Sequence, residues 1–245
     1  MRLDWLKPDW PTPPWVRALT TTRQGGVSRG PYAGLNLATH VGDDPVLVTH
    51  NRQWLHATLA LPAEPQWLEQ VHGTCAVDAG TPTDCPADAS YAHRSGVVCA
   101  VLTADCLPVL FCDRDGTRVA AAHAGWRGLL AGVLEQTAAA LAADPGTLMA
   151  WLGPAIGPTA FEVGEEVRAT FLDTDAGATV AFRPSPSGRW LADIYQLARL
   201  RLTTIGLGAI HGGGLCTFSD PQRFYSYRRD GTCGRMASLI WLTPR

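Results

Sequence analysis

The sequence has no long apolar run and little net charge. Of its 245 residues 17% are charged, and the formal net charge is −2 at pH 7. No apolar stretch approaches the roughly 18 residues that cross a bilayer, so no membrane-spanning helix is expected. The first residues, MRLDWLKPDWPTPPW, combine acids and prolines where a signal peptide needs an apolar segment, which predicts a cytoplasmic protein. A near-neutral chain also lacks the field that gathers nucleic acid or anionic lipid, so neither is an expected partner.

The chain also lacks a CxxC motif. Its seven cysteines are scattered, and an odd number cannot pair completely. A zinc ribbon built from neighbouring cysteines is therefore excluded, and a disulfide framework is not expected. Most of these thiols should be buried as small apolar groups. Any metal site has to draw its ligands from distant parts of the chain.

Strand and helix patterns alternate without a repeat period or a linker, which predicts one domain over residues 1–245. Hairpin signals, such as the Asp-Gly turn in CDRDGT between the two central strands, argue against a purely parallel sheet and favour a mixed α/β (α+β) fold. Strands are predicted at 16–22, 67–71, 97–103, 119–123 and 149–152, with a last strand pair around SYRRDGTCGRM. Helices are predicted from 44 to before 62, at 129–141, from about 164 and at 193–207, and loops at 78–95 and 173–190.

Reactive side chains follow three of the predicted strands. Cys106 follows the strand at 97–103, His123 ends the strand at 119–123, and His72 follows the strand at 67–71. A rigid strand that ends in a reactive side chain is a common arrangement in enzymes. Two histidines and a cysteine could bind zinc and leave its fourth position open. Spacing alone also allows Cys106 to be a nucleophile with a histidine base, or all three to be packing residues.

Several arginines are candidates for binding an anion. Arg23 and Asn36 lie in the glycine-rich segment RQGGVSRGPYAGLNL, whose exposed backbone N–H groups could bind phosphate. Arg52 lies within the helix that follows this segment and could turn inward. Arg228 and Arg229 lie in the basic loop near the end of the chain. Each of these residues could instead be an ordinary turn or surface residue.

The motifs together resemble the laccase-domain (YfiH-like) family, formerly called polyphenol oxidases and now associated with purine nucleoside phosphorylase activity. The resemblance extends through nearly the whole chain, in the order TTRQGGVSRGPYAGLNL, HVGDDP, NRQWL, EQVHG, LTADCLPVLF, AAHAGWRG, GPAIGP, FEVGEEV and YSYRRDGTCGRMASLIWL. It implies a layered α/β sandwich around mixed sheets. It also implies that His72, Cys106 and His123 are zinc ligands.

The resemblance further implies phosphorolysis of adenosine, inosine or methylthioadenosine, with adenosine deamination as a related activity. Its partners would be a nucleoside and phosphate, bound by a monomer or homodimer. Zinc could orient phosphate, or hold the water that attacks in deamination. Asp105 and Arg52 are then the candidate catalytic residues, and Arg23, Asn36, Arg52, Arg228 and Arg229 the candidate phosphate-binding residues. Asp105 could also simply cap a turn. Trp126 and Phe161 could stack on a purine.

Three alternatives remain at this point. A copper-dependent phenol oxidase is disfavoured because multicopper sites need many histidines and this chain has seven, although a Cys/His site binds copper more tightly than zinc by intrinsic affinity. A role in editing peptidoglycan precursors has also been attached to bacterial members of the family. The third alternative is a non-catalytic protein in which zinc only stabilises the fold.

Overall fold

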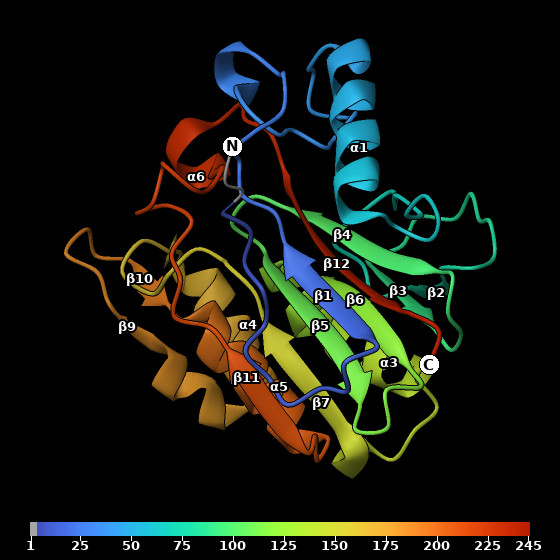
Figure 1. The fold of residues 1–245 in the computed structure, drawn as a ribbon. Coiled ribbons are helices and arrows are strands. Elements are labelled where there is room, and N and C mark those ends of the chain that lie inside the picture. Colours follow the sequence, from blue (N-terminus) through green and yellow to red (C-terminus); the bar gives the residue numbers. More distant parts are fainter. Residues whose placement is uncertain (1–3) are drawn as a thin grey trace.

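A six-stranded mixed sheet forms the centre of the molecule in the computed structural model, which describes residues 4–245 (Figure 1). Its strand order is β11-β7-β5-β6-β3-β2, with parallel pairs at the two edges and antiparallel pairs between them. The strands are β2 (Ala76–Asp78), β3 (Ala89–Ala92), β5 (Leu107–Asp113), β6 (Val119–Ala124), β7 (Leu148–Leu152) and β11 (Ala209–Gly212).

A three-stranded antiparallel sheet packs on one face of the central sheet. It consists of β1 (Val16–Thr20), β12 (Met236–Leu242) and β4 (Val98–Thr103), with β12 in the middle. Alternate residues of its strands face the central sheet, so Cys99, Val101 and Ile240 are buried against Leu110 and Ala121. This period of two is what places one apolar layer between the sheets.

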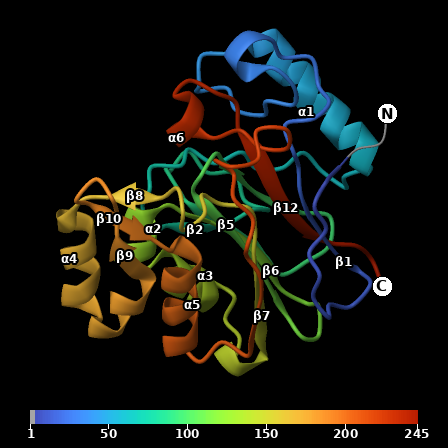
Figure 2. The ribbon, with the colours of Figure 1, turned by 90° about the vertical axis from the view of Figure 1, so that its left-hand side faces the viewer.

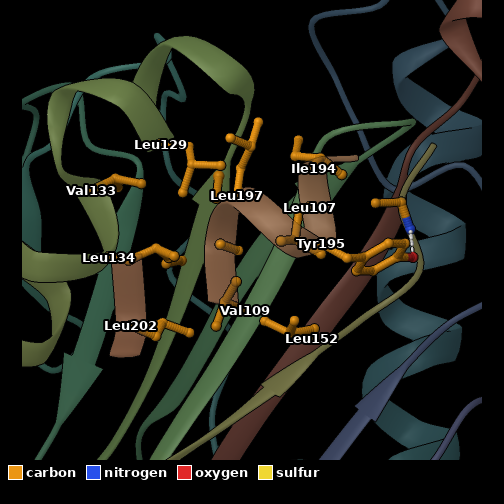
Figure 3. Close-up of a cluster of buried hydrophobic side chains, with 14 of the residues drawn as sticks. Leu107, Val109, Leu129, Val133, Leu134, Leu152, Ile194, Tyr195, Leu197 and Leu202 are labelled. Carbon is orange, nitrogen blue, oxygen red and sulfur yellow. Dashed lines mark hydrogen bonds between the residues drawn. The ribbon is translucent and has the colours of Figure 1, made fainter. Parts of the chain in front are cut away.

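Helices cover the outer faces of both sheets. The central sheet carries α2 (Trp126–Ala131), α3 (Val133–Ala140) and α5 (Ile194–Thr204) on the side away from β1 and β12, as Figure 2 shows. Figure 3 shows the apolar cluster between them, in which Leu129, Leu134 and Leu197 pack over Leu107 and Val109. The outer face of the three-stranded sheet packs against α1 (Pro45–Leu59).

A small third sheet and short helices complete the fold. The sheet has the order β8 (Glu162–Val163), β10 (Trp190–Ala192), β9 (Phe182–Pro184). The remaining helices are α4 (Glu165–Thr174), α6 (Tyr227–Asp230) and the 3-10 turns Gly30–Tyr32, Pro145–Thr147 and Ala176–Ala181. Within residues 4–245, no helix is long and apolar enough to cross a membrane. The predicted fold class, a layered α/β sandwich around mixed sheets, is confirmed.

The strand predictions near the candidate ligands need correction. Residues 67–71 form no strand, because the Gln70 side chain, rather than the backbone, binds the N–H and C=O of Leu102 (2.8 Å each). The predicted loop 78–95 contains β3. Strand β5 was not predicted, and the CDRDGT turn joins β5 to β6 rather than the strands at 97–103 and 119–123. Those two strands lie in different sheets.

Two later predictions also differ from the structure. The strands on either side of SYRRDGTCGRM are β11 and β12, which do not pair but belong to different sheets, and the segment between them contains α6. The predicted loop 173–190 contains β9. The predicted helix 129–141 is two helices, because Gly132 ends α2 in the left-handed conformation (φ 101°) before α3 begins.

Gly132→Ala should therefore lower the free energy of unfolding by about 1–2 kcal/mol, the cost of forcing a side-chain-bearing residue into this conformation. A Cβ at this position would meet its nearest atoms at 3.6 Å, so crowding adds little. Urea denaturation measures the change. Gly146→Ala is the control, because Gly146 has no positive φ and a Cβ there finds ordinary contacts of 3.5–3.9 Å. Equal stability of the two variants would contradict this reason for the helix break.

Candidate functional site

The structure brings the three predicted metal ligands together. His72 lies in the loop before β2, Cys106 in the turn between β4 and β5, and His123 near the end of β6. Pairing of β5 with β6 places Pro108 opposite His123, which brings the preceding turn against the histidine. The ligand atoms of the three residues all lie within 4.8 Å of one another. Sγ of Cys106 is 3.7 Å from Nε2 of His72.

A glycine at the end of β6 makes this close approach possible. A Cβ at Gly125 would lie 2.5 Å from Cδ2 of His72 and 3.0 Å from Sγ of Cys106. Any larger residue would therefore push the ligands apart. Gly125, the first glycine of HAGWRG, is required by the site rather than by the turn, because its own φ is an ordinary −64°.

One buried carboxylate organises two of the ligands. Asp88, which is fully buried just before β3, accepts hydrogen bonds from the backbone N–H groups of Val71 (3.1 Å), His72 (3.0 Å) and Gly73 (2.6 Å). These bonds hold His72 in the left-handed conformation (φ 61°), which is costly for a non-glycine residue. Nδ1 of His123 donates to the same carboxylate at 2.7 Å, which directs Nε2 toward the other ligands.

The donor set fits a zinc ion. Tetrahedral zinc holds a thiolate and an imidazole nitrogen about 3.6 Å apart, close to the 3.7 Å between Cys106 and His72. Burial by itself raises the pKa of the Cys106 thiol, but the charge of His123 and hydrogen bonds from both histidines outweigh it and lower the pKa to about 6. The thiolate is the form of cysteine that binds metals.

The three ligands open into a pocket of about 550 Å³. Part of its wall is apolar or aromatic, formed by Leu102, Trp126, Ile156, Phe161, Ile194 and Tyr227. Another part is basic, formed by His40, Arg127, Arg228 and Arg235. Within the described chain, Asp105 is the one carboxylate in the lining. An apolar wall with a few charged groups is typical of a small-molecule site.

Asp105 is hydrogen-bonded to three separate segments of the chain. Its buried carboxylate accepts hydrogen bonds from the hydroxyl of Thr217 and the backbone N–H of Arg228, both at 2.6 Å. Its own carbonyl accepts from the N–H of Ile156 at 2.9 Å. It lies in the left-handed region (φ 90°). Both carboxylate oxygens are thus occupied by the protein, as expected of a positioning residue.

Of the arginines predicted to bind phosphate, Arg228 lines the pocket. Arg52, on α1, makes its contacts elsewhere. Its Nε donates to the carbonyl of Leu37 (2.9 Å), and its guanidinium lies 4.3 Å from the centre of the Trp67 ring. Asn36 is fully buried and donates to the carboxylate of Asp43 at 2.9 Å. Neither Arg52 nor Asn36 lines the pocket among the described residues.

Arg23 and Arg229 also lie outside the pocket lining of the described chain. Arg23 donates to two backbone carbonyls and lies 4.7 Å from the centre of the Tyr225 ring. Arg229 donates to three backbone carbonyls and forms an ion pair with Asp230 at 2.7 Å. Their contacts join the closing loop to its surroundings.

Sequence reasoning missed Asp88, His40, Arg127 and Arg235 as members of the site. Arg127 has a signal in the sequence, because it follows His123 within the motif HAGWRG. Arg235 was one of several arginines in the closing loop, with nothing to distinguish it. Asp88 lies in a predicted loop, and no local pattern indicates its four hydrogen bonds.

Comparison with known proteins identifies the family. The family model that matches residues 17–243 is described as multi-copper polyphenol oxidoreductase laccase. A purine nucleoside phosphorylase of Pseudomonas aeruginosa is 59% identical over 239 residues, which are 97% of this chain and 98% of the relative. The purine nucleoside phosphorylase YfiH of Escherichia coli is 57% identical, with the same coverage of 97% and 98%.

Solved structures show the same fold. A Neisseria meningitidis protein superposes with a TM-score of 0.93 and 52% identity, covering 98% of this chain and 100% of its own. YlmD of Geobacillus stearothermophilus superposes with a TM-score of 0.89 and 32% identity, covering 99% and 97%. The chain therefore belongs to the laccase-like, YfiH-type family that the matching model describes as multi-copper polyphenol oxidoreductase laccase.

Proposed function

We propose that this protein is a zinc-dependent purine nucleoside phosphorylase. The observation that carries the proposal is the cluster of His72, Cys106 and His123 in a pocket that is also lined by apolar and basic residues. Relatives more than half identical over almost the whole chain are named purine nucleoside phosphorylases. Adenosine, inosine and methylthioadenosine are the proposed nucleosides, and inorganic phosphate is the second substrate.

In the proposed reaction an oxygen of phosphate bonds to C1′ of the ribose while the bond from C1′ to the purine nitrogen breaks. The electron pair of the broken bond leaves with the base, and a proton must then reach the base. Zinc, when bound by His72, Cys106 and His123, supplies a Lewis acid that can orient and polarise an oxygen ligand. The apolar wall, with Phe161 and Trp126, accommodates the purine.

The chain's own polar residues position these groups. Asp105 holds the backbone of Arg228, whose Nη1 donates to the carbonyl of Glu162 at 2.8 Å. Asp105 is thus proposed as a positioning residue, and Arg228 as a substrate-binding one. Arg23, Asn36, Arg52 and Arg229 are proposed to support the pocket walls, since their polar groups already bind neighbouring segments.

The test is release of free base from inosine, adenosine and methylthioadenosine, with and without phosphate, on protein of measured metal content. We expect base release only with phosphate, formation of ribose 1-phosphate or its methylthio analogue, and a turnover number on the order of 1 s⁻¹ or above. Ammonia release from adenosine measures the proposed deaminase side activity in the same samples. Full zinc content without cleavage of any of the three nucleosides would refute the proposal. Copper-dependent oxidation of a phenol by the same protein would instead support the phenol oxidase alternative.

A further inference from the structure

Arg235 presents an unneutralised charge to the pocket. It lies directly before β12 and is half-buried. Its Nη1 donates to the carbonyls of Cys233 (2.8 Å) and Gly234 (3.0 Å), which fixes the guanidinium while leaving Nε and Nη2 for another partner. No carboxylate of residues 4–245 lies within ion-pair distance of it. Such an oriented cation in a cavity wall is ready to bind an anion.

A second pocket residue, His40, is affected by the positive charge of Arg235. His40, in the loop before α1, lines the same pocket. Burial lowers the pKa of His40, and the charges of Arg235 and Arg52 lower it further. The loop before α1, α6 and the beginning of β12 lie at one end of the molecule (Figure 1). Arg52 also acts on His40 through its charge, although its own side chain binds the carbonyl of Leu37 and lies over the Trp67 ring.

The rest of the lining does not neutralise this charge. The guanidinium of Arg127 lies 4.5 Å from the centre of the Trp126 ring and makes no side-chain hydrogen bond or ion pair with the part of the chain that the structure describes. Arg228 donates to a backbone carbonyl, which carries no full charge. The carboxylate of Asp105 is turned to Thr217 and the Arg228 backbone. The pocket lining thus has three guanidinium groups against one carboxylate, so its charges sum to a positive value.

We propose that Arg235 and His40 form an oxyanion subsite of this pocket, and that its ligand is inorganic phosphate. The planar fork of an arginine suits two oxygens of one phosphate, and histidine adds a further donor. That phosphate is a reactant here rests on the proposed function. The subsite differs from the predicted one, because Arg235 lines the pocket, whereas Arg23, Arg52 and Arg229 lie outside its lining in the described chain.

Arg235→Gln tests this subsite by binding and by kinetics. Calorimetric titration of inorganic phosphate into the full-length protein gives the Kd, and phosphorolysis assays give separate KM values for phosphate and inosine. We expect both phosphate constants to rise about 10- to 100-fold, and the KM for inosine and the metal content to stay within about twofold. Arg235→Lys should recover part of the lost phosphate affinity, because lysine keeps the positive charge but cannot bind two phosphate oxygens with a planar guanidinium. Arg17→Gln, an exposed change on β1, is the charge control.

Phosphate constants within about twofold of wild type in Arg235→Gln, at full metal content, would overturn the subsite. His40→Gln provides a second measurement that leaves the Cys233 and Gly234 contacts intact, and it should raise the phosphate Kd at least about threefold. Phosphate binding that is lost with Arg235→Gln, in a protein that cleaves no nucleoside, would support the subsite and refute the proposed function. Phosphate-dependent cleavage unaffected by either variant would support the function and overturn the subsite.

Discussion

Replacing Cys106 with alanine should empty the metal site and abolish turnover. The variant removes the one anionic ligand, and loss of about 3 kcal/mol of binding free energy would weaken zinc binding more than 100-fold. Metal analysis of the purified protein should show a zinc content far below wild type. Phosphorolysis should fall by a similar factor and recover in part when zinc is added in excess, since His72 and His123 remain.

Cys85→Ala is the matched control for Cys106→Ala. Cys85 is an exposed free cysteine outside the pocket lining of the described chain, so its loss should change neither zinc content nor turnover. Retention of full zinc by Cys106→Ala with complete loss of turnover would contradict the ligand assignment. That result would favour the alternative in which Cys106 is a nucleophile and a histidine is its base.

The second large effect is expected for Asp88→Asn. The substitution keeps the size of the side chain, but one of its two oxygens becomes an NH₂ group facing N–H donors. Because the carboxylate holds both the His72 turn and the ring of His123, zinc affinity should fall about 10- to 100-fold. Leaving buried donors without an acceptor should also lower the free energy of unfolding by about 1–3 kcal/mol. Chelator competition and urea denaturation measure the two effects.

Asp84→Asn separates this effect from a general loss of negative charge. Asp84 is exposed in the same segment, four residues before Asp88, and should change neither quantity. A spectrum of the cobalt-substituted protein gives a readout that simple destabilisation does not move, because the absorption of bound cobalt reports its ligand geometry. An unchanged spectrum together with wild-type zinc affinity in Asp88→Asn would contradict the positioning role.

The three candidate ligands stand out in the sequence because each follows or ends a predicted apolar run, and the family resemblance implies that they bind a metal. His123 lies near the end of a fully buried strand of small apolar residues, and Cys106 follows another fully buried strand. The strand expected before His72 is absent, yet His72 still reaches the site, because Gln70 ties its segment to Leu102 through a side chain. His72 thus lies beside Cys106 and His123 through a contact that no strand pattern describes.

The arginines could not be assigned in the same way. A helical arginine such as Arg52 has the same local pattern whether it faces a pocket or a neighbouring loop. Its direction was decided by the carbonyl of Leu37 and the ring of Trp67, 15 residues away on either side. Arg235 enters the site because β12 is the middle strand of its sheet, pairing with both β1 and β4.

The sequence by itself determined the mixed α/β class, the resemblance to the laccase-domain family and the three candidate ligand residues. These follow from periodicity, turn residues and motifs, which are properties of short segments. Only the tertiary structure decided which charged groups surround the ligands. The bond from Arg228 to Asp105 joins residues 123 positions apart, and that from His123 to Asp88 joins residues 35 apart. A buried charge needs a partner, and the packing of the sheets selects that partner across distances that no local pattern can encode.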